Sequence, residues 1–232
     1  MGTIFRPRWS QRRNKVAARD LLLSEISHLE RIFYAGLPGP NAIFERQMLS
    51  SCDVSFMALY ENVPSLFETL KSSFFDCNFK LLNIDIDSDA RLLSEFFNFI
   101  WLDYCGPLTL KRFARFQEVA PLVAKREGVL AVTYLAAREP LSFSQSFLPP
   151  GSFTEGFLKG SLPLSLYRRV NFLRSSAESM GLNFKLTVQP YADHVPMLLF
   201  VFSFSDALSQ SEMTILPYLK DSKHGYQYTI FS

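Results

Sequence analysis

Short apolar runs alternate with stretches of helical periodicity along residues 32–134. The runs have the length of buried strands and lie at residues 32–35, 54–60, 79–86, 99–108 and 128–134. Between them, apolar side chains recur every three or four residues, which predicts helices at residues 42–49, 64–72, 90–97 and 110–125. Asn41 has the side chain of an N-cap for the first of these helices. Alternation of this kind is typical of α/β proteins, so the pattern predicts a doubly wound, mostly parallel sheet.

The remainder of the chain also contains stretches of helical periodicity and strand-like apolar runs. Helical spacing predicts an amphipathic helix before the first strand and another that ends at Gly181, at residues 16–31 and 162–180. Two β-rich runs follow, residues 183–188 and 197–204, and their short connection at 189–196 predicts an antiparallel hairpin. In the tail, residues 206–232, we expect a weak helix and a last strand at 226–231.

One stretch breaks this pattern. Residues 141–161 are rich in Ser, Phe, Pro and Gly and carry almost no charge. Such a stretch inside a domain is typical of a functional lid. The length of 232 residues and the apolar content of 48% suit one sizeable core. We therefore expect a basic N-terminal arm with a leading helix in residues 1–30, and one α/β domain in residues 31–232 with a lid-like insertion.

Composition narrows the class of protein. The sequence has no apolar run of about 18 residues, which a membrane helix needs, and its first residues are basic and polar. Its three cysteines show no CxxC spacing, so the sequence predicts neither a zinc site nor a disulfide framework. These features predict a soluble, cytoplasmic protein without a bound metal; its oligomeric state stays open.

Positive charge is concentrated at the N-terminus, although the net charge of the chain is only +2. The first twenty residues hold one acid, Asp20, against the basic residues Arg6, Arg8, Arg12, Arg13, Lys15 and Arg19. These cations can follow a phosphate backbone, and Trp9 among them can stack on a base. The arm is therefore predicted to bind tRNA or DNA, with a solubilising tail as the alternative.

Polar groups follow several of the predicted strands. Glycines and prolines form a turn at residues 36–39 after the first strand, Glu61 follows the second, Asp85 ends the third, and Asp103 ends the apolar part of the fourth. The carboxyl ends of parallel strands meet at one edge of a sheet, where α/β proteins bind ligands. A nucleoside suits these groups, because glycine permits a close approach and an acid about 20 residues later accepts hydrogen bonds from ribose hydroxyls.

This series of features resembles the class I methyltransferases, which use S-adenosylmethionine. The likeness covers residues 31–204 and includes "GVLAVTY" in the fifth strand and the hairpin around "YADHVPM". Its most distinctive part is Asp103-Tyr104-Cys105-Gly106-Pro107, which is similar to the Asp-Pro-Phe-Gly stretch of tRNA guanine-N2 dimethyltransferases. The resemblance implies a Rossmann-like methyltransferase fold and amino-group methylation of a nucleic acid.

The resemblance also implies roles for individual residues. The cofactor-binding positions would be Gly36, Leu37, Pro38 and Gly39 at the methionine part, Glu61 and Asn62 at the ribose, Asp85 and Ile86 near the adenine, and Asp103. Asp103 and Tyr104 would be catalytic: the carboxylate would accept an N–H of the methyl acceptor, and the phenol ring would stack on the base.

The sequence departs from the family pattern at two places. The family's glycine turn has an acid and three glycines, whereas residues 36–40 hold two glycines, two prolines and no acid. Tyr104 also stands where amino-methylating enzymes have proline. A methyltransferase-like binding protein without activity is therefore an alternative, as is a small-molecule or protein acceptor. A Cys105 nucleophile is a further alternative, whereas a nicotinamide-dependent oxidoreductase would need a G-x-G-x-x-G turn that the sequence lacks.

Overall fold

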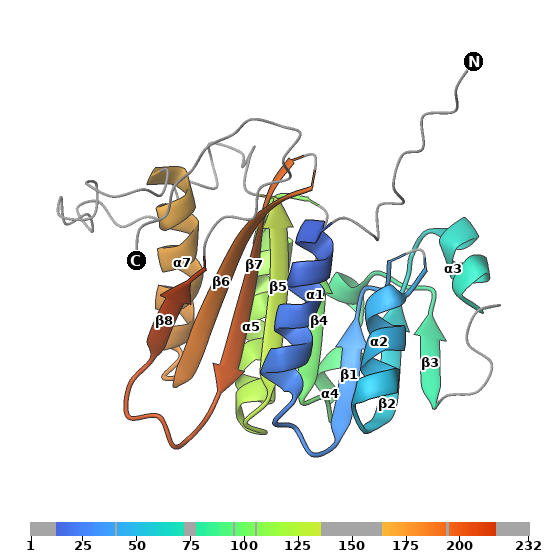
Figure 1. Cartoon of the computed structure of the whole chain (residues 1–232), viewed down its shortest axis with the longest axis horizontal. Helices are drawn as coiled ribbons and strands as arrows, with labels where there is room; N and C mark the ends of the chain where they lie inside the picture. The colour runs from blue at the N-terminus through green and yellow to red at the C-terminus, as the bar shows by residue number, and fades with distance from the viewer. Residues whose placement is uncertain are drawn as a thin grey trace.

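The computed structural model describes residues 13–39, 41–71, 78–94, 96–104, 106–135, 164–193 and 195–216. Within them, an eight-stranded sheet has the order β3-β2-β1-β4-β5-β7-β6-β8 (Figure 1). The strands are β1 (Ile32–Gly36), β2 (Val54–Tyr60), β3 (Phe79–Leu82), β4 (Phe99–Asp103), β5 (Val129–Leu135), β6 (Phe184–Asp193), β7 (Val195–Phe204) and β8 (Glu212–Ile215). The helices are α1 (Arg13–Ile26), α2 (Ile43–Ser51), α3 (Pro64–Lys71), η2 (Ile86–Ser88, a 3-10 turn), α4 (Arg91–Ser94), α5 (Leu110–Ala124) and α7 (Leu164–Ser179).

The strand directions confirm the predicted architecture. Strands β1 to β5 pair in parallel with one another, β7 runs antiparallel to both β5 and β6, and β8 runs parallel to β6. A mostly parallel sheet therefore ends in an antiparallel hairpin, as the sequence predicts. None of the helices among the described residues has the length and apolar character needed to cross a membrane.

Helices cover both faces of the sheet, so the central strands β1, β4 and β5 are largely buried on both sides, whereas the edge strands β3 and β8 are partly exposed. One core cluster joins α4, α5 and α7 to the sheet, and the other joins α1, α2 and α3 to the opposite face (Figure 1). Along β4, Phe99 and Trp101 belong to the α1–α3 side, whereas Ile100 and Leu102 belong to the α5 side. This alternation decides the face on which the side chains after β4 lie.

Helix α1 packs against the strands at the C-terminal end of the chain. Its Glu25 accepts hydrogen bonds from the hydroxyls of Thr187 on β6 at 3.1 Å and Ser203 on β7 at 2.9 Å. Lys185 of β6 adds an ion pair at 3.7 Å. The leading helix is thus fixed to the hairpin, and it spans Arg13–Ile26 instead of the expected residues 16–31.

Several boundaries differ from the sequence predictions. Strand β3 ends at Leu82 instead of residue 86, because the chain turns into η2, which Asp85 caps by accepting a hydrogen bond from the Asp87 N–H at 3.0 Å. Helix α2 begins after Ala42, whose φ is 43°, and not after a side-chain cap by Asn41. The Ala42 N–H instead donates to the Gly39 carbonyl at 2.9 Å and closes the turn through the backbone.

The C-terminal hairpin is longer than the sequence predicts. Strands β6 and β7 pair up to Asp193 and Val195, across what was expected to be a loop. Strand β8 pairs only with Lys185–Val188, so Pro190 lies where β6 is an edge strand and a missing N–H is tolerated. Strand β8 was not predicted, and the weak helix expected in residues 206–232 is not found at 206–216, the part of the tail that the structure describes. The insertion at 141–161 and the predicted strand at 226–231 lie outside the described residues.

Candidate functional site

The strand register brings the predicted positions to one edge of the sheet. Gly36 of β1 pairs with Leu59 of β2 and Trp101 of β4, and Tyr60 pairs with Leu82 of β3. The chain segments that follow these residues contain the glycine turn (residues 36–39), Glu61, Asp85 and Asp103. They therefore share the carboxyl edge of the parallel strands, as predicted.

The two glycines of the glycine turn have different surroundings. A Cβ atom on Gly36 would lie 2.0 Å from the hydroxyl of Tyr34, so the space above β1 is filled by the protein's own side chain. A Cβ atom on Gly39 would meet nothing within 4 Å. Between them, Leu37 packs against the α5-side core and Pro38 is buried. Open space for a ligand in this turn therefore lies at Gly39.

A buried acid lies under this turn. Glu45, in the first turn of α2, is 1% exposed, and its Oε1 accepts a hydrogen bond of 3.0 Å from the hydroxyl of the buried Tyr34. The sequence analysis did not single out Glu45. The signal for it was present, because Glu45 lies three residues after Ala42 and three before Met48, on the apolar face of the helix.

Burial raises the pKa of Glu45 to about 7, and the negative charge of Asp103 acts in the same direction. The Glu45 N–H, the Tyr34 hydroxyl and the charge of Arg19 from α1 oppose this rise. Burial, followed by the charge and hydrogen bond of Glu45, raises the pKa of Tyr34 well above its usual value, so the phenol remains a donor. Glu45 therefore changes its charge in the neutral pH range.

Glu61 presents a carboxylate at the edge, directly after β2. Its backbone N–H donates to the Leu82 carbonyl at 3.0 Å, and its Oε1 accepts from the Val63 N–H at 2.8 Å. The side chain is partly exposed, and Asn62 beside it is exposed. Glu61 thus has a fixed position that a ligand can reach, which fits the predicted ribose acid.

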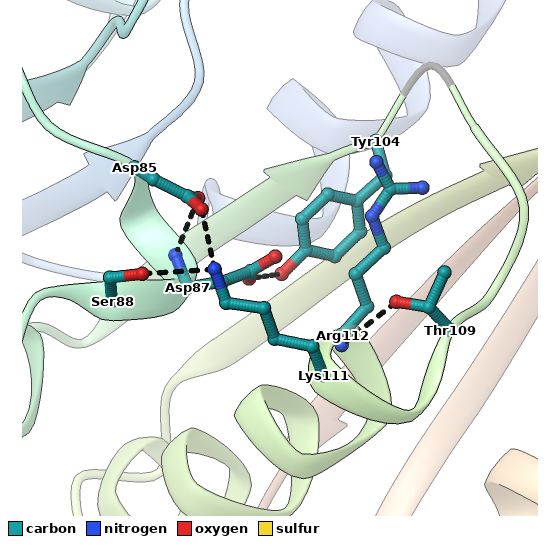
Figure 2. A network of polar contacts seen from close by, with 7 residues as sticks. All are labelled: Asp85, Asp87, Ser88, Tyr104, Thr109, Lys111 and Arg112. Carbon is teal, nitrogen blue, oxygen red and sulfur yellow. Dashed lines mark hydrogen bonds and ion pairs between the residues drawn. The ribbon is translucent and has the colours of Figure 1, made fainter.

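Asp85 is engaged with α5, as Figure 2 shows. Its Oδ2 lies 2.6 Å from Lys111 Nζ, which also donates to Ser88 Oγ at 2.9 Å. Partial burial would raise the pKa of Asp85, but hydrogen bonds from Lys111 and the Asp87 N–H outweigh it and lower the pKa. Ile86 is 1% exposed and belongs to the core. A ligand at the predicted adenine position would therefore meet an ion pair.

Tyr104 is 4% exposed and faces the α5 side (Figure 2). Its hydroxyl donates to Asp87, its ring stacks on Tyr134 with centroids 5.6 Å apart, and the Arg112 guanidinium lies 4.6 Å from the ring centroid. The predicted stacking on a base would require the ring to leave these partners. In the part of the chain that the structure describes, the buried Tyr134 hydroxyl has no hydrogen-bond partner.

Arg112 also shapes the turn that leads into α5. Its Nη1 donates to the Pro107 carbonyl at 2.6 Å, and a Cβ on Gly106 would lie 2.6 Å from the same nitrogen. Thr109 caps the helix by accepting from the Arg112 N–H at 3.3 Å. A side chain at position 106 would therefore have to displace the Arg112 guanidinium from its present position.

Asp103 and Tyr104, which the sequence pairs as catalytic residues, lie on opposite faces. Asp103 is half-buried and acts by its charge on Tyr34 and Glu45, on the α1–α3 side. Tyr104 belongs to the α5-side core. Of the two, Asp103 is the side chain that remains partly exposed at the edge. Cys105 lies outside the described residues, within which no cluster of three or more His, Cys, Asp or Glu side chains could hold a metal ion.

Comparisons with known proteins show the fold. No protein-family model and no curated protein matches the sequence. Among solved structures, the N-methyltransferase NodS from Bradyrhizobium japonicum WM9 in complex with S-adenosyl-L-homocysteine has a TM-score of 0.53 at 10% identity, covering 86% of this chain and 92% of NodS. The METTL16 MTase domain has a TM-score of 0.53 at 13% identity, covering 83% of this chain and 68% of that one. The chain thus has the Rossmann-like methyltransferase fold.

Proposed function

We propose that the protein is a methyltransferase that uses S-adenosylmethionine. The observation that carries this proposal is the position of Glu61, a fixed and reachable carboxylate, on the same sheet edge as the open space at Gly39. In a sheet of this fold, that edge is the ligand-binding edge. The residues fit an adenosyl sulfonium compound, because a carboxylate accepts hydrogen bonds from both ribose hydroxyls and because Glu61 and Glu45 place negative charge near a cation.

When bound, S-adenosylmethionine supplies an electrophilic methyl group on a sulfonium centre. The chain's own residues would bind and orient the cofactor. Glu61 would hold the ribose, and the turn at Gly39 would let the backbone approach the cofactor closely. Asp103 ends β4 half-buried, where its carboxylate can accept an N–H of the methyl acceptor and direct the nitrogen lone pair. The protein's contribution is then positioning and exclusion of water, and not acid or base strength alone.

Calorimetric titration with S-adenosylmethionine and S-adenosylhomocysteine tests the proposal, with NADH as the control ligand. Micromolar binding of the adenosyl compounds alone supports it. Binding of none of the three favours the alternative of a methyltransferase-like binding protein. The two prolines in residues 36–40, which depart from the family's glycine turn, support that alternative. A screen of tRNA, DNA and protein with labelled methyl groups then identifies the acceptor.

Replacing Glu61 by alanine should weaken cofactor binding. Loss of the hydrogen bonds to the ribose hydroxyls costs about 1–3 kcal/mol, which corresponds to an affinity roughly 5-fold to 150-fold lower. The measurement is calorimetry on wild type, Glu61→Ala and Glu68→Ala, the last of which removes a 68% exposed acid on α3. Unchanged affinity in a folded Glu61→Ala protein would remove this residue from the site.

A nucleic acid is the acceptor that we favour, with amino-group methylation as the reaction. The support comes from the basic residues of the N-terminal arm and from the carboxylate of Asp103 at the edge. Arg19 is not available to phosphates, contrary to expectation, because it is 8% exposed in α1 and acts on Glu45. The cations left for this role include Arg6, Arg8 and Arg12, which lie outside the described residues.

Deleting residues 1–12 tests the arm and leaves α1 in place, because the helix begins at Arg13. If the three arginines contact phosphates, the slope of log affinity against log salt should become shallower by up to about 3. Nucleic-acid binding measured between low and physiological salt gives this slope for both proteins. An identical slope would mean that the arm makes no phosphate contact and would favour a small-molecule or protein acceptor.

A further inference from the structure

Glu45 is connected to the glycine turn through a single hydroxyl group. The Tyr34 hydroxyl that donates to Glu45 at 3.0 Å is the same atom that a Cβ on Gly36 would approach to 2.0 Å. Tyr34 Oη therefore lies between the carboxyl group and the backbone of the turn. In the family pattern this turn carries an acid of its own, and here a residue of the following helix brings a carboxyl group to its underside.

Among the described residues, three groups from different elements act on Glu45. Tyr34 on β1 donates a hydrogen bond, Asp103 on β4 contributes negative charge, and Arg19 on α1 contributes positive charge. Asp20 acts in turn on Arg19, whose pKa is lowered by burial. A fully buried carboxyl group beside a second acid costs stability unless it is fully compensated, and such arrangements concentrate at functional sites.

We propose that Glu45 supplies the negative charge that the glycine turn itself lacks, and that it makes the site prefer a sulfonium cation over a neutral thioether. This inference rests on the proposed function. Glu45 is a positioning residue, because it is buried and acts through Tyr34 and through its charge. The preference favours release of S-adenosylhomocysteine after transfer, since that product has lost the sulfonium charge.

The same arrangement couples cofactor binding to the release of a proton from Glu45. Without ligand, the pKa of Glu45 is raised to about 7 by burial. A cation at the turn favours the carboxylate and lowers this pKa, so binding releases a proton. Affinity for S-adenosylmethionine should therefore rise with pH between the two pKa values and level off above about 7. S-adenosylhomocysteine should show a smaller dependence.

Calorimetry on Glu45→Gln measures both effects. Glutamine keeps an acceptor oxygen for the Tyr34 hydroxyl and removes only the charge. We expect the ratio of S-adenosylmethionine to S-adenosylhomocysteine affinity at pH 8 to fall about tenfold. Near pH 6.5, the wild-type binding enthalpy should depend on the ionisation enthalpy of the buffer, and that of Glu45→Gln should not. Glu68→Gln, at an exposed position on α3, is the matched control and should behave as wild type.

Tyr34→Phe provides a second variant. The Tyr34 hydroxyl lowers the pKa of Glu45, so its removal should move the midpoint of the pH dependence upward while the preference for the sulfonium persists above that midpoint. The inference is overturned if Glu45→Gln keeps the ligand ratio and pH profile of the wild type. If Glu45→Gln does not fold, an unmoved midpoint in Tyr34→Phe overturns it. Either result leaves the proposed function standing. Failure of the wild-type protein to bind either ligand overturns both.

Discussion

Replacing Asp103 by alanine is expected to lower methyl transfer about 100-fold, with little loss of cofactor affinity. Asp103 is the partly exposed side chain at the end of β4, where a carboxylate can accept an N–H of the acceptor; a positioned group of this kind contributes about 10²–10⁴-fold to rate. Its negative charge also raises the pKa of Glu45. Removing it therefore lowers that pKa, keeps Glu45 ionised, and leaves the charge that favours the cofactor.

The measurement is transfer of a labelled methyl group to the acceptor, with cofactor affinity determined calorimetrically on the same preparations. Asp53→Ala is the control, because Asp53 is 66% exposed and precedes β2, at the opposite end of the strand from Glu61. A fully active Asp103→Ala protein would exclude Asp103 from the transfer step. An equal loss of affinity and rate would place it in cofactor binding alone.

Alanine should affect different properties at the two glycines of the glycine turn: protein stability at Gly36 and cofactor affinity at Gly39. Gly36→Ala forces a methyl group to within 2.0 Å of the Tyr34 hydroxyl and 2.4 Å of its ring, in a fully buried site, so we expect a loss of about 3 kcal/mol of stability. Gly39→Ala has open space and should change stability by less than about 1 kcal/mol. The same methyl group would occupy space needed by the cofactor, so Gly39→Ala should weaken its binding.

Urea unfolding and cofactor titration of both variants separate these effects. Each glycine serves as the control for the other, since both lie in one turn of four residues. Equal stability of Gly36→Ala and wild type would show that Tyr34 can move out of the turn. Undiminished cofactor affinity in Gly39→Ala would place the ligand elsewhere on the edge.

The fold was predictable because buried parallel strands leave a strong signal. Strand β2 has the predicted bounds, Val54–Tyr60, since this run, in which only Ser55 is polar, lies between the acids Asp53 and Glu61. The short strand Glu212–Ile215 gave no such signal, because four alternating residues form a strand only through pairing with β6. The extension of β6 through Pro190 was not predictable either, because a strand is possible there only through the edge position of this residue, which the sequence does not reveal.

The candidate site was predictable in position but not in its pairings. The carboxyl ends of strands converge by topology, which placed Glu61 and Asp103 correctly on one edge. The ion pair of Asp85 with Lys111 joins residues 26 positions apart, and no local pattern specifies it. Glu45 was hidden for another reason: helical periodicity shows which face a residue occupies, but not that an acid on the apolar face is buried against Tyr34.

The hydrogen bonds of Glu25 bear on how the chain reaches its native state during synthesis. Glu25 is separated by 162 residues from Thr187 and by 178 residues from Ser203. Helix α1 therefore leaves the ribosome well before its partners on β6 and β7 are synthesised. Such distant contacts slow folding, because the intervening chain must be ordered before they form. Until the hairpin emerges, the apolar face of α1 is a surface for chaperones, so truncations that remove β6 and β7 should yield a nascent chain that chaperones retain.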